Sequence, residues 1–348
     1  MRLLGIPTVI DRLVQQAINQ TLTSIYERQF SPGSYGFRPR RGCHDALRGA
    51  QKIIDDGYIY VVDLDLERFF DIVSHSKLIE ILSRTIKDGR VISLIHKYLR
   101  SGVMNKGMFE ASEEGTPQGG PLSPLLSNIM LNELDKELTS RGLPFVRYAD
   151  DSMIFCKSKR AAKRVKESVT RFIEGKLHLK VNRDKTVVSY VQGVKYLGYS
   201  FYVMKGKCQL TVHPKSKAKM KSRLKELTSR SNGWGYAKRK QKLKEYIRGW
   251  VGYYHLANMK RLLLETDEWL RRRIRMCIWK AWKKAKTKVA NLIICGINKY
   301  QAYEWGNTRK GYWRIADSPI LKRAIDNNKL RSAGYATLME AYLEWYPK

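Results

Sequence analysis

Two apolar segments joined by a pair of acids constrain the fold of this chain more than any other feature. Phe145 and Val146 precede the acids Asp150 and Asp151, and residues 153–155 (MIF) follow them. Short apolar segments on either side of a polar turn predict a β-hairpin that carries two carboxylates at its tip. Aspartate is also an ordinary turn residue, so this pair alone does not distinguish a plain turn from a functional site.

A second acidic strand gives the hairpin a possible counterpart. Residues 61–66 (VVDLDL) alternate as a strand does, which places Asp63 and Asp65 on one face and apolar side chains on the other. Buried carboxylates are costly unless they pair with cations or metals, and Mg²⁺ is the usual partner where phosphate is the substrate. Acids from both strands would suit two metal ions about 3.5–4 Å apart, as phosphoryl transfer uses. A solvated edge strand is the alternative.

The charge balance indicates a polyanionic partner. The 348 residues include 66 Lys and Arg against 32 Asp and Glu, a formal net charge of +34. No apolar segment approaches the roughly 20 residues that span a bilayer, and the Met1 end lacks a signal-peptide core. We therefore expect nucleic acid rather than membrane as the partner. Five scattered cysteines without a Cys-x-x-Cys pair favour a reducing, cytoplasmic location without a zinc site.

The sequence divides into three parts of different character. Up to about His213, helical periodicity (residues 10–27, 78–99, 122–138 and 161–177) alternates with β-type segments (58–66, 145–156 and 194–203). This order predicts an α+β sheet domain. Residues 214–288 hold 24 Lys and Arg against five acids, with interleaved aromatics, and predict a basic helical module. From about Ile293, Gly, Asn and Trp recur and indicate a small third domain.

Four segments in order resemble the polymerase blocks of a known family. They are residues 4–12 (LGIPTVIDR), 34–39 (SYGFRP), 116–124 (TPQGGPLSP) and 148–151 (YADD). Each block is weak alone, but the ordered set is specific, and the chain resembles the bacterial group II intron reverse transcriptases and maturases, most like class C. The resemblance covers essentially the whole chain. It implies a right-hand polymerase with fingers and palm (1–205), an all-α thumb or X/maturase domain (206–292) and a C-terminal DNA-binding region (293–348).

The resemblance also implies which acids matter. The first catalytic Asp of the family lies six residues before a second Asp, with an aromatic residue at the fifth place, and this pattern selects Asp65, Phe70 and Asp71. Asp63 receives no role. Asp65, Asp150 and Asp151 would be catalytic and, with the Leu66 carbonyl, would bind two Mg²⁺, for which Mn²⁺ is a possible substitute.

Further positions follow from the same resemblance. Phe70 would be the steric gate against a ribose 2′-OH, although core packing beside Phe69 is the alternative. The other nucleotide-binding candidates are Gln118, Lys185, Arg2 and Arg38. Leu197 and Gly198 match the primer grip. The candidates for nucleic-acid binding are Arg248, Trp250, Tyr253, Tyr254, Arg271, Arg272, Arg273 and Arg275. Their aromatic members would stack on bases or simply pack helices together, and residues 311–314 (GYWR) resemble the DNA-binding region.

The function implied is RNA-directed DNA polymerisation for a mobile group II intron. Its partners would be intron RNA as template, a DNA target or primer, and dNTPs, with splicing and retrohoming roles and no membrane. A non-catalytic splicing cofactor is the alternative, and an RNA-dependent RNA polymerase is disfavoured by Phe70. The chain departs from the family in two ways: we expect that it lacks the HNH endonuclease domain and the upstream fingers extension. Oligomeric state is not indicated.

Overall fold

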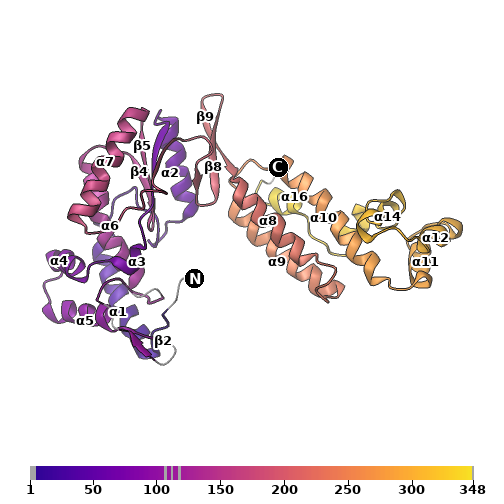
Figure 1. The fold of residues 1–348 in the computed structure, drawn as a ribbon, viewed down its shortest axis with the longest axis horizontal. Helices are drawn as coiled ribbons and strands as arrows, with labels where there is room; N and C mark the ends of the chain where they lie inside the picture. The colour runs from indigo at the N-terminus through magenta and orange to yellow at the C-terminus, as the bar shows by residue number, and fades with distance from the viewer. Residues whose placement is uncertain (1–4, 106–107, 111–112, 117–118, 347–348) are drawn as a thin grey trace. The chain divides into compact units, whose positions relative to one another are not determined.

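The structure is a computed structural model of the 348-residue chain. It describes all residues except 1–4, 106–107, 111–112, 117–118 and 347–348. The chain forms two compact units, residues 1–197 with 201–208 and residues 198–200 with 209–348. The first unit mixes helices and strands and the second is mainly helical, as the sequence predicts (Figure 1).

A four-stranded antiparallel sheet organises the first unit. Its strands are β1 (Tyr60–Leu64), β4 (Phe145–Tyr148), β5 (Asp151–Cys156) and β6 (Val187–Tyr190), in the order β4-β5-β1-β6. Strands β4 and β5 form the predicted hairpin, with Tyr148 opposite Asp151. The hairpin prediction is therefore confirmed.

Helices cover both faces of this sheet. Helix α7 (Lys159–Lys176) packs on β1, β5 and β6, and α6 (Ser123–Ser140) shares a core with it that includes Val62 and Leu64 of β1. The alternate residues Val61, Met153 and Phe155 are fully buried outside that core, and α2 (Cys43–Asp55) packs against β4. Strand alternation therefore buries apolar side chains on two faces, while the acids come at the strand ends.

The remaining helices of the first unit follow the predicted periodicity with one break. The helix expected at residues 10–27 is present as α1 (Val9–Tyr26). Residues 78–99 form two helices rather than one, because Asp88 caps a new helix by accepting a hydrogen bond from the Arg90 N–H at 2.8 Å. The other elements here are α3 (Phe69–Ile72), α4 (His75–Thr85), α5 (Gly89–Arg100), β2 (Val103–Asn105) and β3 (Met108–Glu110).

A three-stranded sheet lies where the chain passes between the units. Its strands are β7 (Lys195–Tyr196), β8 (Tyr199–Met204) and β9 (Lys207–Val212), and both β8 and β9 contribute residues to the two units.

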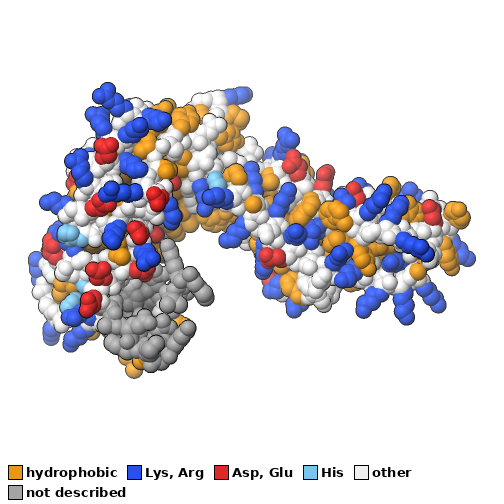
Figure 2. All heavy atoms as spheres, in the orientation of Figure 1, with side chains coloured by type: hydrophobic (Ala, Val, Ile, Leu, Met, Phe, Trp, Pro, Cys, Tyr) orange, Lys and Arg blue, Asp and Glu red, His pale blue; other side chains and the backbone are white. Residues whose placement is uncertain are grey.

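The second unit is otherwise helical and basic. Its helices are α8 (Pro214–Leu227), α9 (Tyr236–Tyr254), α10 (Lys260–Ala281), α11 (Ala285–Ile294), α12 (Lys299–Gly306), α13 (Tyr312–Ile315), α14 (Pro319–Ala324), α15 (Asn327–Ser332) and α16 (Leu338–Leu343). Lys and Arg side chains are prominent on the face of these helices drawn in Figure 2. Across the described part of the chain, no helix combines the length and the apolar character needed to cross a membrane.

The C-terminal segment closes onto the long helices of this unit. Helix α16 packs on α9 and α10, and the buried Asp267 carboxylate of α10 accepts hydrogen bonds from the N–H groups of Leu338 and Met339, each at 2.9 Å. Residues 293–348 therefore belong to the same compact unit as α9 and α10. A separate third domain stays a prediction.

Candidate active site

The predicted acids gather where β1 ends and the β4–β5 turn begins. Strand β1 pairs with β5 so that Asp63 is opposite Met153 and Leu64 is opposite Ser152. The next position in this antiparallel register places Asp65 across from Asp151. Asp150 occupies the two-residue turn between β4 and β5, beside Ala149. Asp150 follows Asp65 by 85 positions in the sequence, and Asp151 comes directly after Asp150. The three carboxylates thus share one end of the sheet.

The electrostatics of Asp63 show how strongly negative this end is. The pKa of the Asp63 carboxyl is raised to about 6, first by burial and then by the negative charges of Asp151 and Asp65. Lys195 opposes the shift. Asp63 receives no role from the sequence, yet the charges of Asp151 and Asp65 act on its carboxyl.

The backbone after β1 is fixed by the segment that precedes β6. The N–H of Asn182 donates to the Asp65 carbonyl at 2.9 Å, and the Glu67 N–H donates to the Lys180 carbonyl at 2.9 Å. These bonds flank the bridge between Leu66 and Val181, so the carbonyl of Leu66 points away from residues 180–182. That orientation leaves the predicted carbonyl ligand directed toward the side on which β5 lies.

Lys185 lies beside one of the predicted acids. Its ammonium Nζ is 3.4 Å from Asp65 Oδ2, and both side chains remain solvent accessible. Thr186, the next residue, is fully buried and its hydroxyl accepts a hydrogen bond from the Asp65 N–H at 3.2 Å. The buried threonine anchors this segment against Asp65, which keeps the Lys185 ammonium within reach of the carboxylate.

Phe70 borders the loop that contains the predicted nucleotide contact. The ring of Phe70 packs edge-on against Phe69, with ring centroids 5.2 Å apart, and it is partly buried at the margin of the core. Its carbonyl accepts a hydrogen bond from the Thr116 N–H at 2.7 Å. Gln118, two residues further along, lies outside the described residues, as does Arg2.

The glycines after Gln118 make a close backbone contact within the protein. A Cβ at Gly119 would lie 2.2 Å from the Gly5 carbonyl oxygen, and one at Gly120 would lie 2.6 Å from Gln15 Oε1. Gly119 also has a φ of +117°, a conformation that favours glycine. Gly119 therefore packs against the backbone of Gly5 in the first polymerase block, whereas the contact at Gly120 is with the end of the Gln15 side chain.

Arg38 is occupied by internal partners in this structure. Its guanidinium forms an ion pair with Glu27 at 2.7 Å and donates to the carbonyls of Ser31 at 2.6 Å and Ser34 at 2.9 Å. Only 7% of Arg38 is exposed. This geometry favours a structural role for Arg38 over a contact with the nucleotide.

The predicted primer grip is a tight turn with both residues in the left-handed region. Leu197 has φ 48° and Gly198 has φ 82°, as a two-residue hairpin turn between strands requires. The Gly198 carbonyl accepts hydrogen bonds from the His213 N–H at 3.1 Å and the Ser216 hydroxyl at 2.8 Å. A Cβ at Gly198 would lie 2.5 Å from the Tyr254 hydroxyl, so glycine is also required there by space.

The residues at this end of the sheet fit a divalent cation in their chemistry. Carboxylate and carbonyl oxygens are the ligands that Mg²⁺ prefers. The pKa of Asp63 is raised first by burial and then by the charges of Asp151 and Asp65, and a nearby cation would oppose both effects. Within the described part of the chain, however, no three His, Cys, Asp or Glu side chains converge into a metal-binding group. Carboxylates of like charge repel one another, which opposes their convergence in the absence of a cation.

The predicted nucleic-acid contacts of α9 are mostly packed together. The Trp250 and Tyr254 rings have centroids 4.6 Å apart, and Tyr253 and Tyr254 both contact Tyr199. All four rings are half-buried or buried, and Arg248 on the same helix is exposed. These aromatic contacts are what helix packing requires, while Arg248 remains accessible to a phosphate.

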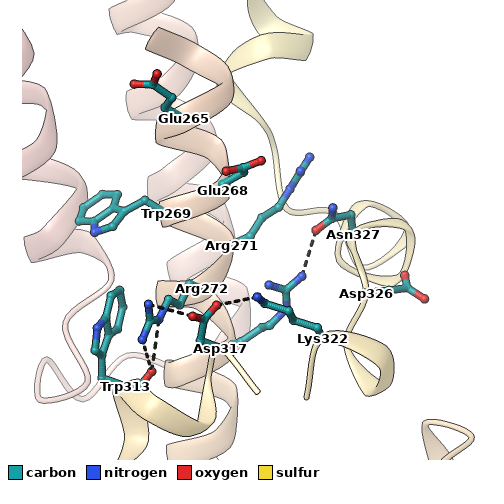
Figure 3. A pocket seen from close by; sticks show the side chains of 11 residues that line it. Glu265, Glu268, Trp269, Arg271, Arg272, Trp313, Asp317, Lys322, Asp326 and Asn327 are labelled. Carbon is teal, nitrogen blue, oxygen red and sulfur yellow. Dashed lines mark hydrogen bonds and ion pairs between the residues drawn. The ribbon is translucent and has the colours of Figure 1, made fainter. Parts of the chain in front are cut away.

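The four arginines predicted on α10 divide into two pairs. Arg273 donates to Thr228 Oγ1 at 2.6 Å, and Arg275 donates to the Ile325 carbonyl at 2.8 Å, so both brace the unit from within. Burial lowers the pKa of each. Arg271 and Arg272 line an open groove of about 570 Å³, and the internally bonded Arg275 also contributes to its lining (Figure 3).

That groove combines aromatic and charged side chains. Arg272 lies over the Trp313 ring, 3.9 Å from its centroid, and pairs with Asp317 at 3.2 Å. Trp269 and Trp313 lie on the same side of it in Figure 3. Its basic side chains are matched by Glu265, Glu268, Asp317 and Asp326, so the groove is not a strongly positive one.

Carboxylates at the ends of adjacent strands in a helix-covered antiparallel sheet are typical of a nucleic-acid polymerase. The sequence matches the family described as reverse transcriptase (RNA-dependent DNA polymerase) over residues 1–201. The chain therefore belongs to the reverse transcriptase family. A second family, the group II intron maturase-specific domain, matches residues 217–293, and this confirms the resemblance to group II intron proteins.

Curated relatives agree with both matches. Protein YkfC of Escherichia coli is 35% identical over 238 residues, which cover 57% of this chain and 62% of that protein. The group II intron-encoded protein LtrA of Lactococcus lactis subsp. cremoris is 33% identical, over 58% of this chain and 45% of that protein. The chain thus spans about half the length of the curated relatives it matches. Members of the family use divalent metal ions.

Among solved structures, apo telomerase from Candida tropicalis aligns with a TM-score of 0.47 and 13% identity, over 93% of this chain and 61% of that chain.

Proposed function

We propose that this protein is an RNA-directed DNA polymerase of a group II intron, which extends a primer 3′-OH with dNTPs on an RNA template. The observation that carries this proposal is the placement of Asp65 beside the Asp150–Asp151 turn in a chain of the reverse transcriptase family. Strands that meet in this register bring hard oxygen ligands to one place, as two-metal phosphoryl transfer requires.

The protein's own residues would divide the work between metal binding and substrate placement. Asp65, Asp150, Asp151 and the Leu66 carbonyl would hold two Mg²⁺ ions, which when bound supply the charge that activates the primer hydroxyl and neutralises the leaving pyrophosphate. Lys185, whose Nζ is 3.4 Å from Asp65 Oδ2, would donate a proton to pyrophosphate. Phe70 would exclude a ribose 2′-OH, and Gln118 would contact the incoming nucleotide.

The parts of the chain would take the roles that the family suggests. Residues 1–205 would form fingers and palm, residues 206–292 the thumb, and residues 293–348 a DNA-binding region. Leu197 and Gly198 would support the primer end, and the exposed Arg248 and the half-buried Arg271 would contact phosphates. The partners proposed are intron RNA, a DNA target or primer, and dNTPs, with action in the bacterial cytosol.

A primer-extension assay tests the catalytic assignment. We expect Asp150→Ala or Asp151→Ala to abolish dNTP addition on an RNA template, because each removes an oxygen ligand. RNA affinity should stay within about twofold, since phosphate contacts by basic side chains dominate affinity. Asp56→Ala, at an exposed position after α2, is the matched control and should extend normally. Extension retained by Asp150→Ala would refute the assignment.

A splicing-cofactor function is supported by a separate observation. The maturase-specific match covers α8 to α10, where basic side chains dominate the sequence. RNA binding by this unit would need none of the acids of the first unit. A splicing assay with the triple variant Asp65→Ala, Asp150→Ala, Asp151→Ala distinguishes the two roles: splicing should persist when DNA synthesis is lost.

A further inference from the structure

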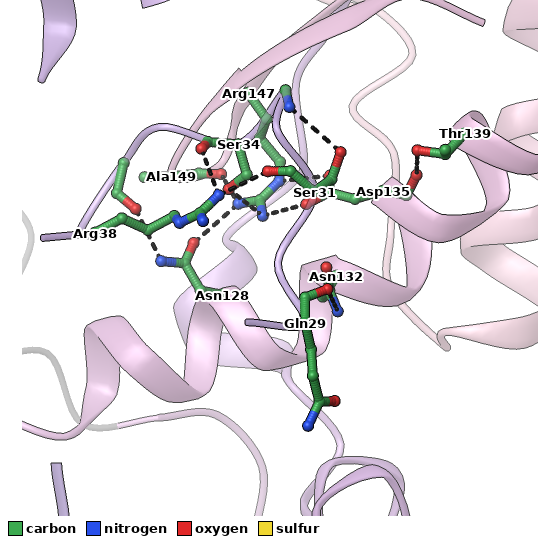
Figure 4. Close-up of polar contacts among 12 residues, drawn as sticks. Gln29, Ser31, Ser34, Arg38, Asn128, Asn132, Asp135, Thr139, Arg147 and Ala149 are labelled. Atoms are coloured by element: carbon green, nitrogen blue, oxygen red, sulfur yellow. Dashed lines mark hydrogen bonds and ion pairs between the residues drawn. The ribbon is translucent and has the colours of Figure 1, made fainter. Parts of the chain in front are cut away.

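A fully buried arginine lies next to the catalytic turn. Arg147, in β4, is a charged residue in a mostly buried strand, and 0% of its surface is exposed. Its guanidinium forms an ion pair with Asp135 of α6, whose side chain is also fully buried, through Nη2 at 2.6 Å and Nε at 2.8 Å (Figure 4). Such a pair costs more to bury than apolar side chains of similar size.

The remaining donors of Arg147 reach the turn and the segment beneath it. Nη1 donates to the Ala149 carbonyl at 2.9 Å and to Asn128 Oδ1 at 3.0 Å, while Nη2 donates to the Ser34 hydroxyl at 2.8 Å. The planar guanidinium therefore connects three separate segments of chain in a fixed geometry. One of its contacts is the peptide that leads directly into Asp150.

The turn held in this way is conformationally demanding. Ala149 has φ 57°, in the left-handed region that residues with a side chain rarely adopt. A hydrogen bond to the Ala149 carbonyl favours this conformation over the relaxed alternatives. The positions of the Asp150 and Asp151 carboxylates depend on the same conformation.

The backbone of Gly36 contacts the same turn. A Cβ at Gly36 would lie 2.2 Å from the Ala149 nitrogen, so the two backbones are in direct contact. Asn128 donates from Nδ2 to the Gly36 carbonyl at 2.8 Å, which ties this contact back to Arg147 through one side chain. The polymerase block at residues 34–39 is thereby packed against the turn.

We propose that Arg147 is a positioning residue, held by Asp135, Asn128 and Ser34, which fixes the Ala149 peptide and hence the Asp150 and Asp151 carboxylates for catalysis. This inference rests on the proposed polymerase function. A buried, fully hydrogen-bonded network is rigid, because each member has one arrangement that satisfies all its partners. It does not touch substrate, and it acts only through the turn.

Two asparagines of α6 provide a matched test. Asn128 and Asn132 are both buried, lie one helical turn apart, and each donates its side-chain amide to a backbone carbonyl, that of Gly36 at 2.8 Å and that of Gln29 at 3.3 Å. Only Asn128 contacts Arg147. Asn128→Ala and Asn132→Ala thus each remove one buried side-chain amide from α6. Only Asn128→Ala also removes a contact to Arg147.

The measurements are steady-state primer extension by the full chain, its Mg²⁺ dependence, and thermal unfolding of each variant. We expect Asn128→Ala to lower kcat about tenfold and Arg147→Lys about 100-fold, because displacements of 1 Å or less have effects of this order. The KM for dNTP should change less than about twofold, since the network does not touch the nucleotide. Asn132→Ala should keep the kcat of the wild-type protein.

A second readout does not depend on turnover. Mn²⁺ binding without nucleic acid, followed by electron paramagnetic resonance, should weaken in Asn128→Ala and Arg147→Lys and remain unchanged in Asn132→Ala. Equal kcat and equal Mn²⁺ binding in the two asparagine variants would overturn the proposal, whether or not the arginine variant folds. If Asp150→Ala remains active, the polymerase function itself fails. If Asp150→Ala is inactive and the two asparagine variants have equal kcat and equal Mn²⁺ binding, only the positioning role fails.

Discussion

The buried ion pair between Arg147 and Asp135 makes a quantitative prediction about stability. In Arg147→Met, the Asp135 carboxylate would keep its buried position without a counterion, and the Asn128 and Ser34 oxygens would lose a donor. Removing one partner of a buried pair costs about 3–5 kcal/mol, because the other charge is left uncompensated. We therefore expect the free energy of unfolding of the first unit to fall by that amount.

The compensating variant separates the charge from the packing. Replacing both partners, Arg147→Met with Asp135→Leu, removes the stranded carboxylate and should recover most of the loss, leaving a deficit of about 1–2 kcal/mol from unpaired neighbours. A double-mutant cycle would then show a large coupling energy between the two sites.

The distribution of tryptophan supplies an internal control for this assay. All eight tryptophans lie between Trp234 and Trp345, in the second unit. Urea unfolding followed by circular dichroism reports on both units, while tryptophan fluorescence reports on the second alone. We expect Arg147→Met to shift the dichroism transition of the first unit more than the fluorescence transition. A loss below about 1 kcal/mol, or a double variant less stable than Arg147→Met, would refute the electrostatic reasoning.

Three further predictions concern the substrate, pH and salt. Phe70→Ala should admit ribonucleotides in primer extension, and unchanged discrimination between rNTP and dNTP would count against the gate. Because the raised pKa of Asp63 is about 6, its ionised form opposes folding, so metal-free wild-type protein should lose stability as pH rises from about 4 to 6. Asp63→Asn should remove this slope and gain about 1–2 kcal/mol at pH 7 in urea unfolding with EDTA, after allowance for solvent screening. RNA affinity should fall steeply between 50 and 200 mM salt in a filter-binding titration, and a flat response would contradict phosphate binding by the basic helices.

The parts of this fold that could be predicted from sequence are those set by local patterns. Apolar periodicity located α1 and the hairpin, and Asp in a strand marked the acidic end of the sheet, because these signals extend over a few residues. The break at Asp88 was missed, since the apolar spacing continues across it and only the capping bond to Arg90 ends the pattern. Sheet order was also beyond local patterns, because β6 pairs with β1 across more than 100 residues.

The arrangement of charged residues was harder to predict for a related reason. Arg271 and Arg273 look alike in sequence, yet Arg271 lines a groove and Arg273 donates a hydrogen bond to Thr228 Oγ1 within the unit. Arg147 gave one usable signal, a charged residue inside a strand that is otherwise apolar, which indicates a buried partner. No sequence signal distinguishes its partner Asp135, because the helix that contains it is rich in polar residues.

The cap that Asp267 places on α16 has a consequence for chain cleavage. Arg309 and Lys310 lie in the exposed connection between α12 and α13, where trypsin has access. A cut there leaves the hydrogen bonds from Leu338 and Met339 to Asp267 intact, along with the packing of α16 on α9 and α10. The nicked protein would therefore remain a single particle in solution, and its two pieces would separate only on denaturation.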